Sequence, residues 1–353
     1  MTSTKAHPKF SEVTLALRYL KAPLGSGVVV DVGASQGQVS KTFARHGWRC
    51  VSFEPAKDSF EALEREMGEW PDALLIPKAV TDQTRQDVAF YRSAQSTGLH
   101  SLFRFHESQG EETVVDATRL DDALDERDIA GVDALIIDIG AGNYRALRSL
   151  DLTRFRPRLV AVAYVDERSS VLGDTPSDLV RHMTGHGYAA FISEWRAGAP
   201  DSGDVFVRCA PYPVPHHPGR GWLVFVPEDD AATFDEALTS YLAQLAADAL
   251  DTVDQLQRSL RRSRRQARKL RTSVRDQALR LAQAPDVATP PASAAEKKRN
   301  ARMMRKVRQD QVKLARKVAR LERRLVAVEQ RVKRGSVWRR AARKVLKPVR
   351  SSG

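Results

Sequence analysis

The chain has 353 residues, 42% of them hydrophobic, and a formal net charge of +13. The charge is unevenly placed: residues 1–240 hold 25 Lys and Arg against 35 Asp and Glu, and residues 241–353 hold 32 against 9. An acidic part of net charge −10 therefore precedes a basic tail of net charge +23. No run of 18 apolar residues predicts a transmembrane helix, and the first ten residues lack the apolar run of a secretory signal.

The two cysteines, Cys50 and Cys209, stand alone, with no CxxC or ligand-like spacing. This favours a reduced, cytoplasmic protein over a disulfide framework or a zinc site. His182 and His186 have the i, i+4 spacing of helical metal ligands, but no third ligand lies near them in the sequence. The sequence therefore predicts no metal site.

Short apolar runs alternate with helical patterns over the first two thirds of the chain, which predicts an α/β fold built on a parallel sheet. Uninterrupted Val, Ile and Leu runs are typical of strands buried on both faces. In chain order we expect a lead-in helix at Phe10–Lys21 capped by Ser11, a strand at Val28–Val30 running into Asp31, a helix through Phe43, a strand at Cys50–Phe53, a helix at Ser59–Met67, a strand at Leu74–Val80, antiparallel strands at Asp87–Tyr91 and Thr113–Leu120, a short helix from Asp121, a strand at Ala134–Asp138, a helix at Tyr144–Leu150, a strand at Leu159–Val165, a helix at Pro176–His186, and strands at Ala189–Ser193, Val205–Cys209 and Trp222–Val226.

The tail has a different pattern. Apolar or small residues recur at spacings of three and four from Phe234 to about Leu281, which predicts a coiled-coil helix. An Ala/Pro-rich stretch breaks this pattern before a second heptad seam. The predicted organisation is a lead-in helix at 1–26, an α/β domain at 27–230, a coiled-coil helix at 234–283, an Ala/Pro linker at 284–300, a second coiled-coil helix at 301–335 and a basic amphipathic segment at 336–353.

The strongest local signal is the stretch Asp31-Val-Gly-Ala-Ser-Gln-Gly37 between a strand and a helix, with Glu54 at the end of the next strand. Glycines at the first strand–helix turn let the backbone approach a ligand, and the second strand ends beside that turn. A carboxylate there can accept both ribose hydroxyls of a nucleoside cofactor. The alternative is that Gly33 and Gly37 only make a tight turn, but the position of Glu54 favours cofactor binding.

The same loop narrows the kind of cofactor. A dinucleotide fingerprint needs G-x-G-x-x-G, whereas this loop has one turn glycine fewer and Ser40 in place of the third glycine. An anion at Asp31 suits the α-amino group and sulfonium of S-adenosylmethionine better than it suits a pyrophosphate. No G-x-x-x-x-G-K-[ST] motif occurs, which excludes a P-loop NTPase.

Several ordered stretches resemble one known family, the FkbM-type S-adenosylmethionine-dependent methyltransferases. The resemblance runs from about Gly27 to Val226 and implies a Rossmann-like methyltransferase domain with a seven-stranded sheet. It also implies O-methylation, often of sugars or small secondary metabolites, with Asp31, Gly33 and Gly37 at the methionine moiety and Glu54 at the ribose. The stretches that carry it are Val30–Gly37, Phe53-Glu54-Pro55, Lys78-Ala79-Val80, Thr118–Leu124 and Ala134–Asp138.

The chain departs from the family's pattern in two places. Ser35 stands where the family usually has Asn, and it stays in the predicted cofactor-binding set. The family's fourth-strand motif reads roughly Lys-Ile-Asp-Val-Glu-Gly-x-Glu, and here Ile136, Gly140 and Asn143 replace the Lys and the two Glu. Charged groups are therefore missing next to the expected reaction centre.

Methyl transfer to a hydroxyl needs the acceptor oxygen in line with the methyl group, and often a base for its proton. Asp138 stands at the C-terminal end of its strand, where an open α/β sheet places ligands. We predict it as the base or as a carboxylate that orients the substrate; the alternative is that it caps the following helix. His100 is a second candidate base, whose alternative is an ordinary loop histidine.

Three interpretations of the tail are open. Homo-oligomerisation through the two heptad seams is favoured over a solvated single helix, because acids for stabilising ion pairs are few. The cations of Arg258–Arg271 suit a polyanion, and Val337–Lys347 suits an anionic membrane surface. Trp338 is the only aromatic residue among the tail's basic segments, so sequence-specific nucleic-acid binding is not predicted.

The sequence thus predicts an S-adenosylmethionine-dependent O-methyltransferase that acts on a sugar, glycan or small-metabolite hydroxyl, in the cytoplasm or peripherally at the membrane surface. The first alternative is a scaffold protein that binds the cofactor, has weak catalysis and is organised by its coiled-coil tail. The second is a nucleic-acid methyltransferase recruited by the tail, which the acidic body disfavours.

Overall fold

The computed structural model describes residues 10–24, 26–95, 99–165, 170–197, 204–214 and 219–282, together with Arg302. The chain divides into two compact units. One is Lys9–Tyr241, and the other combines Met1–Pro8 with Leu242–Gly353. Every residue predicted for the candidate site belongs to the first unit.

An eight-stranded sheet forms the centre of the first unit, in the order β10-β9-β11-β8-β7-β1-β2-β3. The strands from β8 to β3 in this order pair in parallel, whereas β11 runs antiparallel to both β8 and β9, and β10 runs antiparallel to β9. The strands are β1 (Val28–Val32), β2 (Arg49–Phe53), β3 (Leu74–Ile76), β7 (Ala134–Ile137), β8 (Leu159–Val165), β9 (Tyr188–Arg196), β10 (Val205–Pro211) and β11 (Arg220–Pro227).

The expected parallel sheet is thus confirmed only for its β8-to-β3 part. Between β9 and β11 the described residues contain no crossover helix, and strands joined without one pair antiparallel. The described sheet also has eight strands rather than the seven that the resemblance implies, because β10 adds a strand beside β9.

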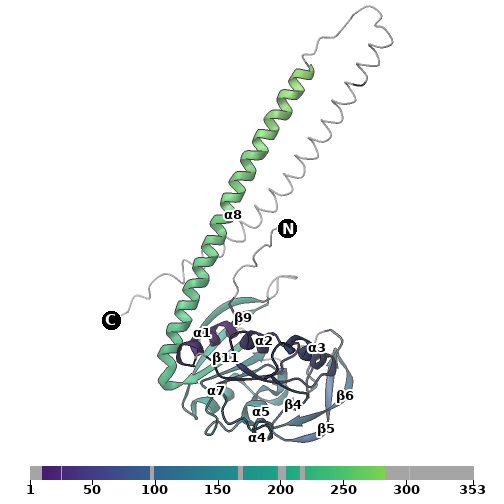
Figure 1. The fold of residues 1–353 in the computed structure, drawn as a ribbon, viewed down its shortest axis with the longest axis vertical. Helices are drawn as coiled ribbons and strands as arrows, with labels where there is room; N and C mark the ends of the chain where they lie inside the picture. The colour runs from purple at the N-terminus through teal and green to yellow at the C-terminus, as the bar shows by residue number, and fades with distance from the viewer. Residues whose placement is uncertain are drawn as a thin grey trace, which may run out of the picture. The chain divides into compact units, whose positions relative to one another are not determined.

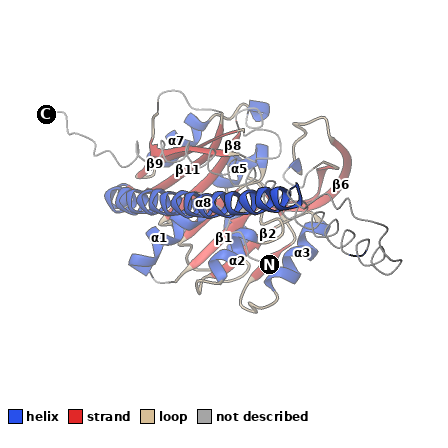
Figure 2. Ribbon diagram, turned by 90° about the horizontal axis from the view of Figure 1, so that it is seen from above, coloured by secondary structure: helices blue, strands red, loops and turns tan. Residues whose placement is uncertain are grey.

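Helices cover both faces of this sheet (Figures 1 and 2). One face carries α1, α2 and α3, and the other carries α4, α5 and α7, which gives a three-layer α/β architecture. Thr14 N–H donates to Ser11 Oγ (3.3 Å), which confirms the predicted cap of the lead-in helix. The helices are α1 (Glu12–Leu24), α2 (Gln38–Ala44), α3 (Lys57–Met67), α4 (Leu120–Asp125), α5 (Asn143–Arg148) and α7 (Pro176–Thr184), with 3₁₀ turns η2 (Gly140–Gly142), η3 (Ser170–Leu172) and η4 (Glu228–Asp230).

A second, three-stranded sheet has the order β4-β6-β5, with β4 at Ala79–Val80, β5 at Arg85–Ser93 and β6 at Gln109–Thr118. The antiparallel pairing of β5 and β6 confirms the predicted antiparallel excursion. The single strand predicted at Leu74–Val80 is wrong, because β3 ends at Ile76 and β4 belongs to the other sheet. Pro77 lies between them and has no N–H to continue a ladder.

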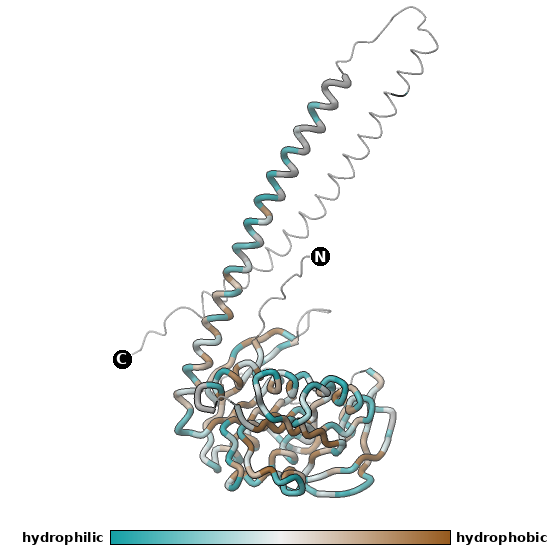
Figure 3. Tube along the Cα trace, viewed as in Figure 1, coloured by the Kyte–Doolittle hydropathy of each residue, from teal (hydrophilic) through white to brown (hydrophobic). Residues whose placement is uncertain are grey.

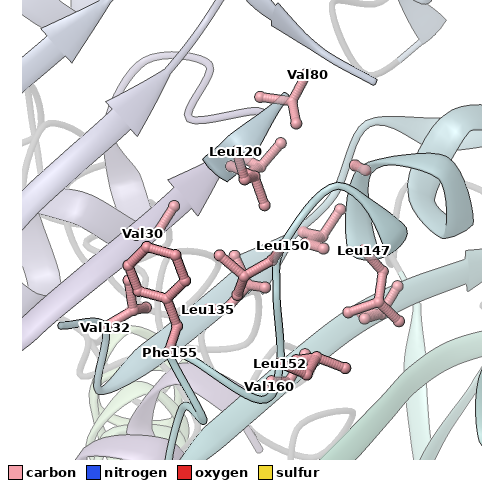
Figure 4. Packing of buried hydrophobic residues seen from close by; sticks show 14 of the residues in the cluster. Val30, Val80, Leu120, Val132, Leu135, Leu147, Leu150, Leu152, Phe155 and Val160 are labelled. Carbon is pink, nitrogen blue, oxygen red and sulfur yellow. The ribbon is translucent and has the colours of Figure 1, made fainter. Parts of the chain in front are cut away.

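The core of the first unit follows the apolar runs of the sequence. Figure 3 shows hydrophobic residues along the central strands and hydrophilic residues on much of the surrounding helices. Val30, Leu135 and Val160, from three neighbouring strands, are at most 1% exposed. Side chains of the segment 147–155 pack against them (Figure 4). Burial of these side chains holds β1, β7 and β8 together, and it thereby positions the strand ends at which the candidate site lies.

The helix α8 runs from Ala231 to Ala282 and covers most of the stretch for which a coiled-coil helix is expected. Its pairing with another helix stays a prediction. The linker expected at 284–300, the second helix at 301–335 and the segment at 336–353 lie outside the described residues, apart from Arg302. In the part of the chain that the structure describes, no helix combines the length and the hydropathy needed to cross a membrane.

Candidate functional site

A cavity of about 330 Å³ opens at the carboxyl edge of the large sheet. It lies where β1, β2 and β7 end, and there the strand order reverses: β2 and β3 lie on one side of β1, β7 and β8 on the other. Open α/β sheets bind ligands at such a point, and the volume is typical of a small-molecule site. Of the predicted residues, the cavity is lined by Gly33, Ser35, Glu54, His100 and Asp138, whereas Asp31 and Gly37 are not part of its lining.

Gly33 makes the turn that follows β1. Its φ of +88° is left-handed, and a Cβ there would lie 2.3 Å from the main-chain oxygen of Asp138. Only glycine therefore lets the ends of β1 and β7 come so close. The N–H groups of Gly33 and Ala34 both donate to the carbonyl oxygen of Phe53, each with an N···O distance of 3.0 Å. The turn thus ties three strand ends together at the cavity.

Glu54 follows β2 and is 7% exposed. Its Oε2 accepts from Ser35 N–H (2.9 Å) and its Oε1 from Ala56 N–H (2.8 Å). Burial raises the pKa of this carboxyl, while the two backbone donors act against the increase and the charge of Asp31 adds to it. Each oxygen accepts one of these bonds and keeps a further lone pair. The carboxylate is therefore held in one orientation and can still accept two hydroxyl groups.

Asp31 lies inside the fold beside the cavity loop, with 2% of its surface exposed. Its Oδ2 accepts from the backbone N–H (3.1 Å) and the hydroxyl (2.5 Å) of Ser40 in the first turns of α2. The Ser40 hydroxyl also contacts Ser52 Oγ at 2.8 Å. Burial raises the pKa of Asp31 to about 6, against the two Ser40 bonds, and Asp138 adds to the increase. The carboxyl group thus joins β1, β2 and α2.

Gly37 and Ser35 shape the loop between β1 and α2. Gly37 is the N-cap of α2 with φ of +87°, and a Cβ there would lie 2.9 Å from Leu63 Cδ1 of α3. Ser35 also has a positive φ, +49°. Asn tolerates this conformation better than Ser does. The loop therefore adopts the backbone that the family's usual Asn would favour, at some strain for Ser35.

Asp138 comes directly after β7, is exposed, and lines the cavity. The family's two motif glutamates are replaced here by residues with local structural roles. Gly140 has φ of +76°, which would strain a glutamate. Asn143 Oδ1 accepts from Ile139 N–H (2.8 Å) and its Nδ2 donates to the carbonyl of Ala163 (2.5 Å), which a carboxylate could not do. Of the motif's carboxylates, Asp138 is the one retained at the cavity.

His100 reaches the same cavity from the loop between β5 and β6. Its Nε2 lies 3.2 Å from the carbonyl oxygen of Ser93, and its ring packs edge-on against Phe90 (centroids 6.2 Å apart). Because a carbonyl only accepts, this contact assigns the proton to Nε2 and leaves Nδ1 as the basic nitrogen. The fold therefore brings both candidate bases, Asp138 and His100, to one cavity.

Sequence reasoning missed the apolar side of the site. Phe53, Phe90 and Phe103 line the cavity together with Leu102. Phe53 lies inside the Phe53-Glu54-Pro55 motif, but the other three come from a stretch with no motif. The alternation at Asp87–Tyr91 predicts a strand and gives no sign of a ligand, and the adjacent Leu102 and Phe103 form no alternating pattern. Gln109, which holds this loop, carried no signal either.

The other histidines of the described ranges and the two cysteines are not part of the cavity lining. The rings of His182 and His186 lie with centroids 4.8 Å apart at an interplanar angle of 53°, and His186 Nδ1 contacts the carbonyl oxygen of His182 (2.8 Å). Among the described residues, no group of three His, Cys, Asp or Glu side chains could hold a metal ion. Cys50 and Cys209 are buried and not disulfide-bonded, and burial raises the pKa of the Cys50 thiol to about 12.

Comparison with known proteins gives one family. Residues 31–189 match the sequence profile described as the methyltransferase FkbM domain. This range contains every residue predicted for the site, from Asp31 to Asp138. No curated protein matches the chain.

Solved methyltransferase structures match most of the first unit at low identity. The O-methyltransferase TomG from Streptomyces achromogenes, solved with S-adenosylmethionine, is 16% identical, with 62% of this chain and 81% of that chain covered and a TM-score of 0.34. An O-methyltransferase from Bacillus cereus, solved with S-adenosylhomocysteine, is 12% identical (63% and 83% covered, TM-score 0.34). The C-terminal domain of precorrin-6Y C5,15-methyltransferase from Rhodobacter capsulatus is 15% identical (61% and 86% covered, TM-score 0.33).

Proposed function

Because the chain carries a methyltransferase domain of the FkbM family at residues 31–189, we propose that it methylates a hydroxyl group of a sugar, a glycan or a small metabolite. The methyl donor is S-adenosylmethionine. The observation that supports this proposal is the cavity at the strand switch point, where Gly33, Glu54 and Asp138 meet. Within one small site lie the glycine turn at Gly33, the Glu54 carboxylate held by two N–H groups, and the exposed Asp138 carboxylate.

The residues present fit this donor. Gly33 lines the cavity, and its missing side chain lets the end of β7 close up against the turn, which brings Asp138 to the site. Glu54 is buried and held by two backbone N–H groups, and it keeps acceptor positions for the two ribose hydroxyls. Asp31 is bound to Ser40, so its negative charge would act on the cationic methionine part through the field rather than by lining the cavity. For Asp31 we propose this action through the field in place of a direct contact.

When bound, S-adenosylmethionine supplies an electrophilic methyl group on a positively charged sulfur. The acceptor hydroxyl would lose its proton to a base of this chain as its oxygen bonds the methyl carbon, and the carbon–sulfur bond would break to leave neutral S-adenosylhomocysteine. Asp138 is the first candidate, because it lines the cavity and is exposed. His100 is the second, through Nδ1. Phe53 and Phe90 exclude water from the apolar wall.

Calorimetry of the full chain with S-adenosylhomocysteine, the demethylated product, tests the site. Wild type should bind, and Glu54→Ala should lose about tenfold to a hundredfold in affinity, because two charge-assisted hydrogen bonds disappear. Glu66→Ala is a matched control, since Glu66 lies on α3 and pairs with Lys41 away from the cavity. Absence of binding by wild type, or equal binding by Glu54→Ala, would refute the proposed site.

We also propose that the basic tail assembles copies of the chain and contacts an anionic membrane surface or another polyanion, which would place the enzyme in the cytoplasm or at its membrane. The support is the net charge of +23 and the heptad seams of residues 241–353. Sedimentation of the full chain should show an oligomer, and co-sedimentation with phosphatidylserine vesicles should fall as salt rises. A monomer would contradict the proposed assembly, and a chain that does not co-sediment with these vesicles would contradict the proposed membrane contact.

A further inference from the structure

The loop between β5 and β6 forms one wall of the cavity. His100, Ser101, Leu102 and Phe103 of this loop all line it. The loop folds back on β5, since Tyr91 N–H donates to the Ser101 carbonyl (2.8 Å) and Ser101 N–H to the Tyr91 carbonyl (3.1 Å). This wall faces the turn after β7, where Asp138 lies. The loop is therefore placed to contact the acceptor.

One side chain holds the loop in shape. Gln109, 1% exposed, uses its amide for four hydrogen bonds to the loop backbone. Its Oε1 accepts from the N–H groups of Phe105 (2.7 Å) and His106 (2.8 Å). Its Nε2 donates to the carbonyls of Leu99 (2.8 Å) and Phe103 (3.3 Å). The wall is thus a fixed structure and not a loosely held connection.

The loop packs against two glycines of η2. Gly140 replaces one of the family's glutamates, and Gly142 precedes Asn143, which replaces the other. A Cβ at Gly142 would lie 3.2 Å from the ring of Phe103, and one at Gly140 would lie 3.4 Å from the ring of Phe105. Larger residues there would push the aromatic rings away. The glycines of η2 therefore set how closely the aromatic wall approaches the turn after β7.

Arg145 lies against this wall. It is the third residue of α5, half-buried, and its guanidinium carbon is 5.0 Å from the centroid of the Phe103 ring. Stacking uses the face of a guanidinium and leaves its N–H groups, which point outward in the plane, for other partners. Within the described residues, Arg145 makes no hydrogen bond and no ion pair. A half-buried cation with open donors thus stacks on a ring that lines the cavity, although Arg145 itself is not part of the lining.

Its neighbour on the helix has a different setting. Arg148 is exposed, stacks on Tyr144 (5.6 Å) and approaches Asp82 at 3.9 Å. Asp174 acts on both arginines only through space, since it forms no ion pair with either in the described part of the chain. Lys78, on the cavity wall, lies 3.7 Å from the half-exposed Glu126. Two cations near the cavity, Arg145 and Lys78, are therefore not neutralised by a close ion pair.

We propose that the acceptor carries an anionic group, a phosphate or a carboxylate, which the Arg145 guanidinium binds through paired N–H donors while the hydroxylated part of the acceptor packs on Phe103. This inference rests on the proposed function and names the acceptor class for the same site. A guanidinium fork matches both anions in geometry. Phosphorylated sugars and uronic acids are the simplest acceptors of this kind.

Three sugars that differ only at carbon 6 serve as probes: glucose, glucose 6-phosphate and glucuronate. Each is titrated into the full chain saturated with S-adenosylhomocysteine. Wild type should bind at least one anionic sugar about tenfold or more tightly than glucose. Arg145→Gln should lose this preference, whereas Arg148→Gln, one turn along the same helix, should keep it. The phosphate and carboxylate arms separate the two anion sources.

Equal binding of all three sugars, no binding of any at millimolar concentration, or a preference that survives Arg145→Gln would overturn the anionic acceptor. Both variants should bind S-adenosylhomocysteine as wild type does, which shows that they are folded. Loss of that binding by wild type itself would instead refute the proposed function. The two failures are therefore distinguishable in one set of titrations.

Discussion

Ile136 of β7 lies directly beside Asp31 of β1 in the parallel pairing of these strands. Registered neighbours on adjacent strands point to the same face of a sheet, so Ile136 stands where the family's usual Lys would approach the Asp31 carboxyl group. Here that carboxyl accepts hydrogen bonds from the N–H and the hydroxyl of Ser40. Burial without a neighbouring lysine is thus what raises the pKa of Asp31 to about 6.

This pKa predicts a pH-dependent difference between wild type and Asp31→Asn. The folded carboxyl binds its proton more tightly than the unfolded one, whose pKa is near 3.8. Wild type therefore loses stability from this group as pH rises from about 4 to 6, and the loss is complete above 6. We expect Asp31→Asn to equal wild type near pH 4 and to exceed it by about 3 kcal/mol at pH 7.5. Urea unfolding at both pH values measures this, and a difference that does not change with pH would contradict it.

The glycine turn after β1 gives a second prediction. Gly33→Ala should destabilise the fold strongly, because its Cβ would meet the Asp138 main-chain oxygen at 2.3 Å as well as adopt a left-handed φ. Gly47→Ala is the matched control, with φ of +82° and open space around the added carbon. We expect a loss of about 1–2 kcal/mol for Gly47→Ala from φ alone and about 2 kcal/mol more for Gly33→Ala.

Chemical denaturation provides both free energies of unfolding, and calorimetry with S-adenosylhomocysteine provides the binding. The affinity should fall in Gly33→Ala and stay unchanged in Gly47→Ala. Equal destabilisation by the two substitutions would mean that the strand ends move apart easily, and that Gly33 is not needed for a close approach at the cavity.

The sequence predicted the strands well where burial alone decides. Leu159–Val165 is found with its predicted bounds as β8, because an uninterrupted apolar run is buried only in a strand that helices cover on both faces of the sheet. It did not predict that Asp31 faces Ser40, since an acidic residue before a glycine turn can bind a ligand or a helix, and only the packing of α2 decides. The approach of Phe103 to Gly142, and of Arg145 to Phe103, joins segments about 40 residues apart. No local pattern encodes such contacts.

The amide of Gln109 gives a third prediction. Gln109→Glu keeps the acceptor oxygen for Phe105 and His106 but sets a carboxylate against the carbonyls of Leu99 and Phe103. The loop should open, and trypsin should cut after Arg104, which is exposed in the loop, about tenfold faster. Gln86→Glu, at an exposed position of β5, adds the same charge without touching the loop and should cut at the wild-type rate. Unchanged cleavage in Gln109→Glu would show that the loop does not depend on this amide.

The choice of base between Asp138 and His100 gives the last prediction. Asp138→Asn keeps the shape of the side chain and removes its capacity to take a proton, so kcat for methyl transfer should fall by about 10² to 10⁴. Its affinity for S-adenosylhomocysteine should stay within about twofold of wild type. His100→Gln removes the basic Nδ1 while its amide can still donate to the Ser93 carbonyl, and it should cost far less. Single-turnover rates with labelled S-adenosylmethionine measure both variants. If the large loss fell on His100→Gln instead, the proton would go to the imidazole, and Asp138 would act by orienting the acceptor hydroxyl.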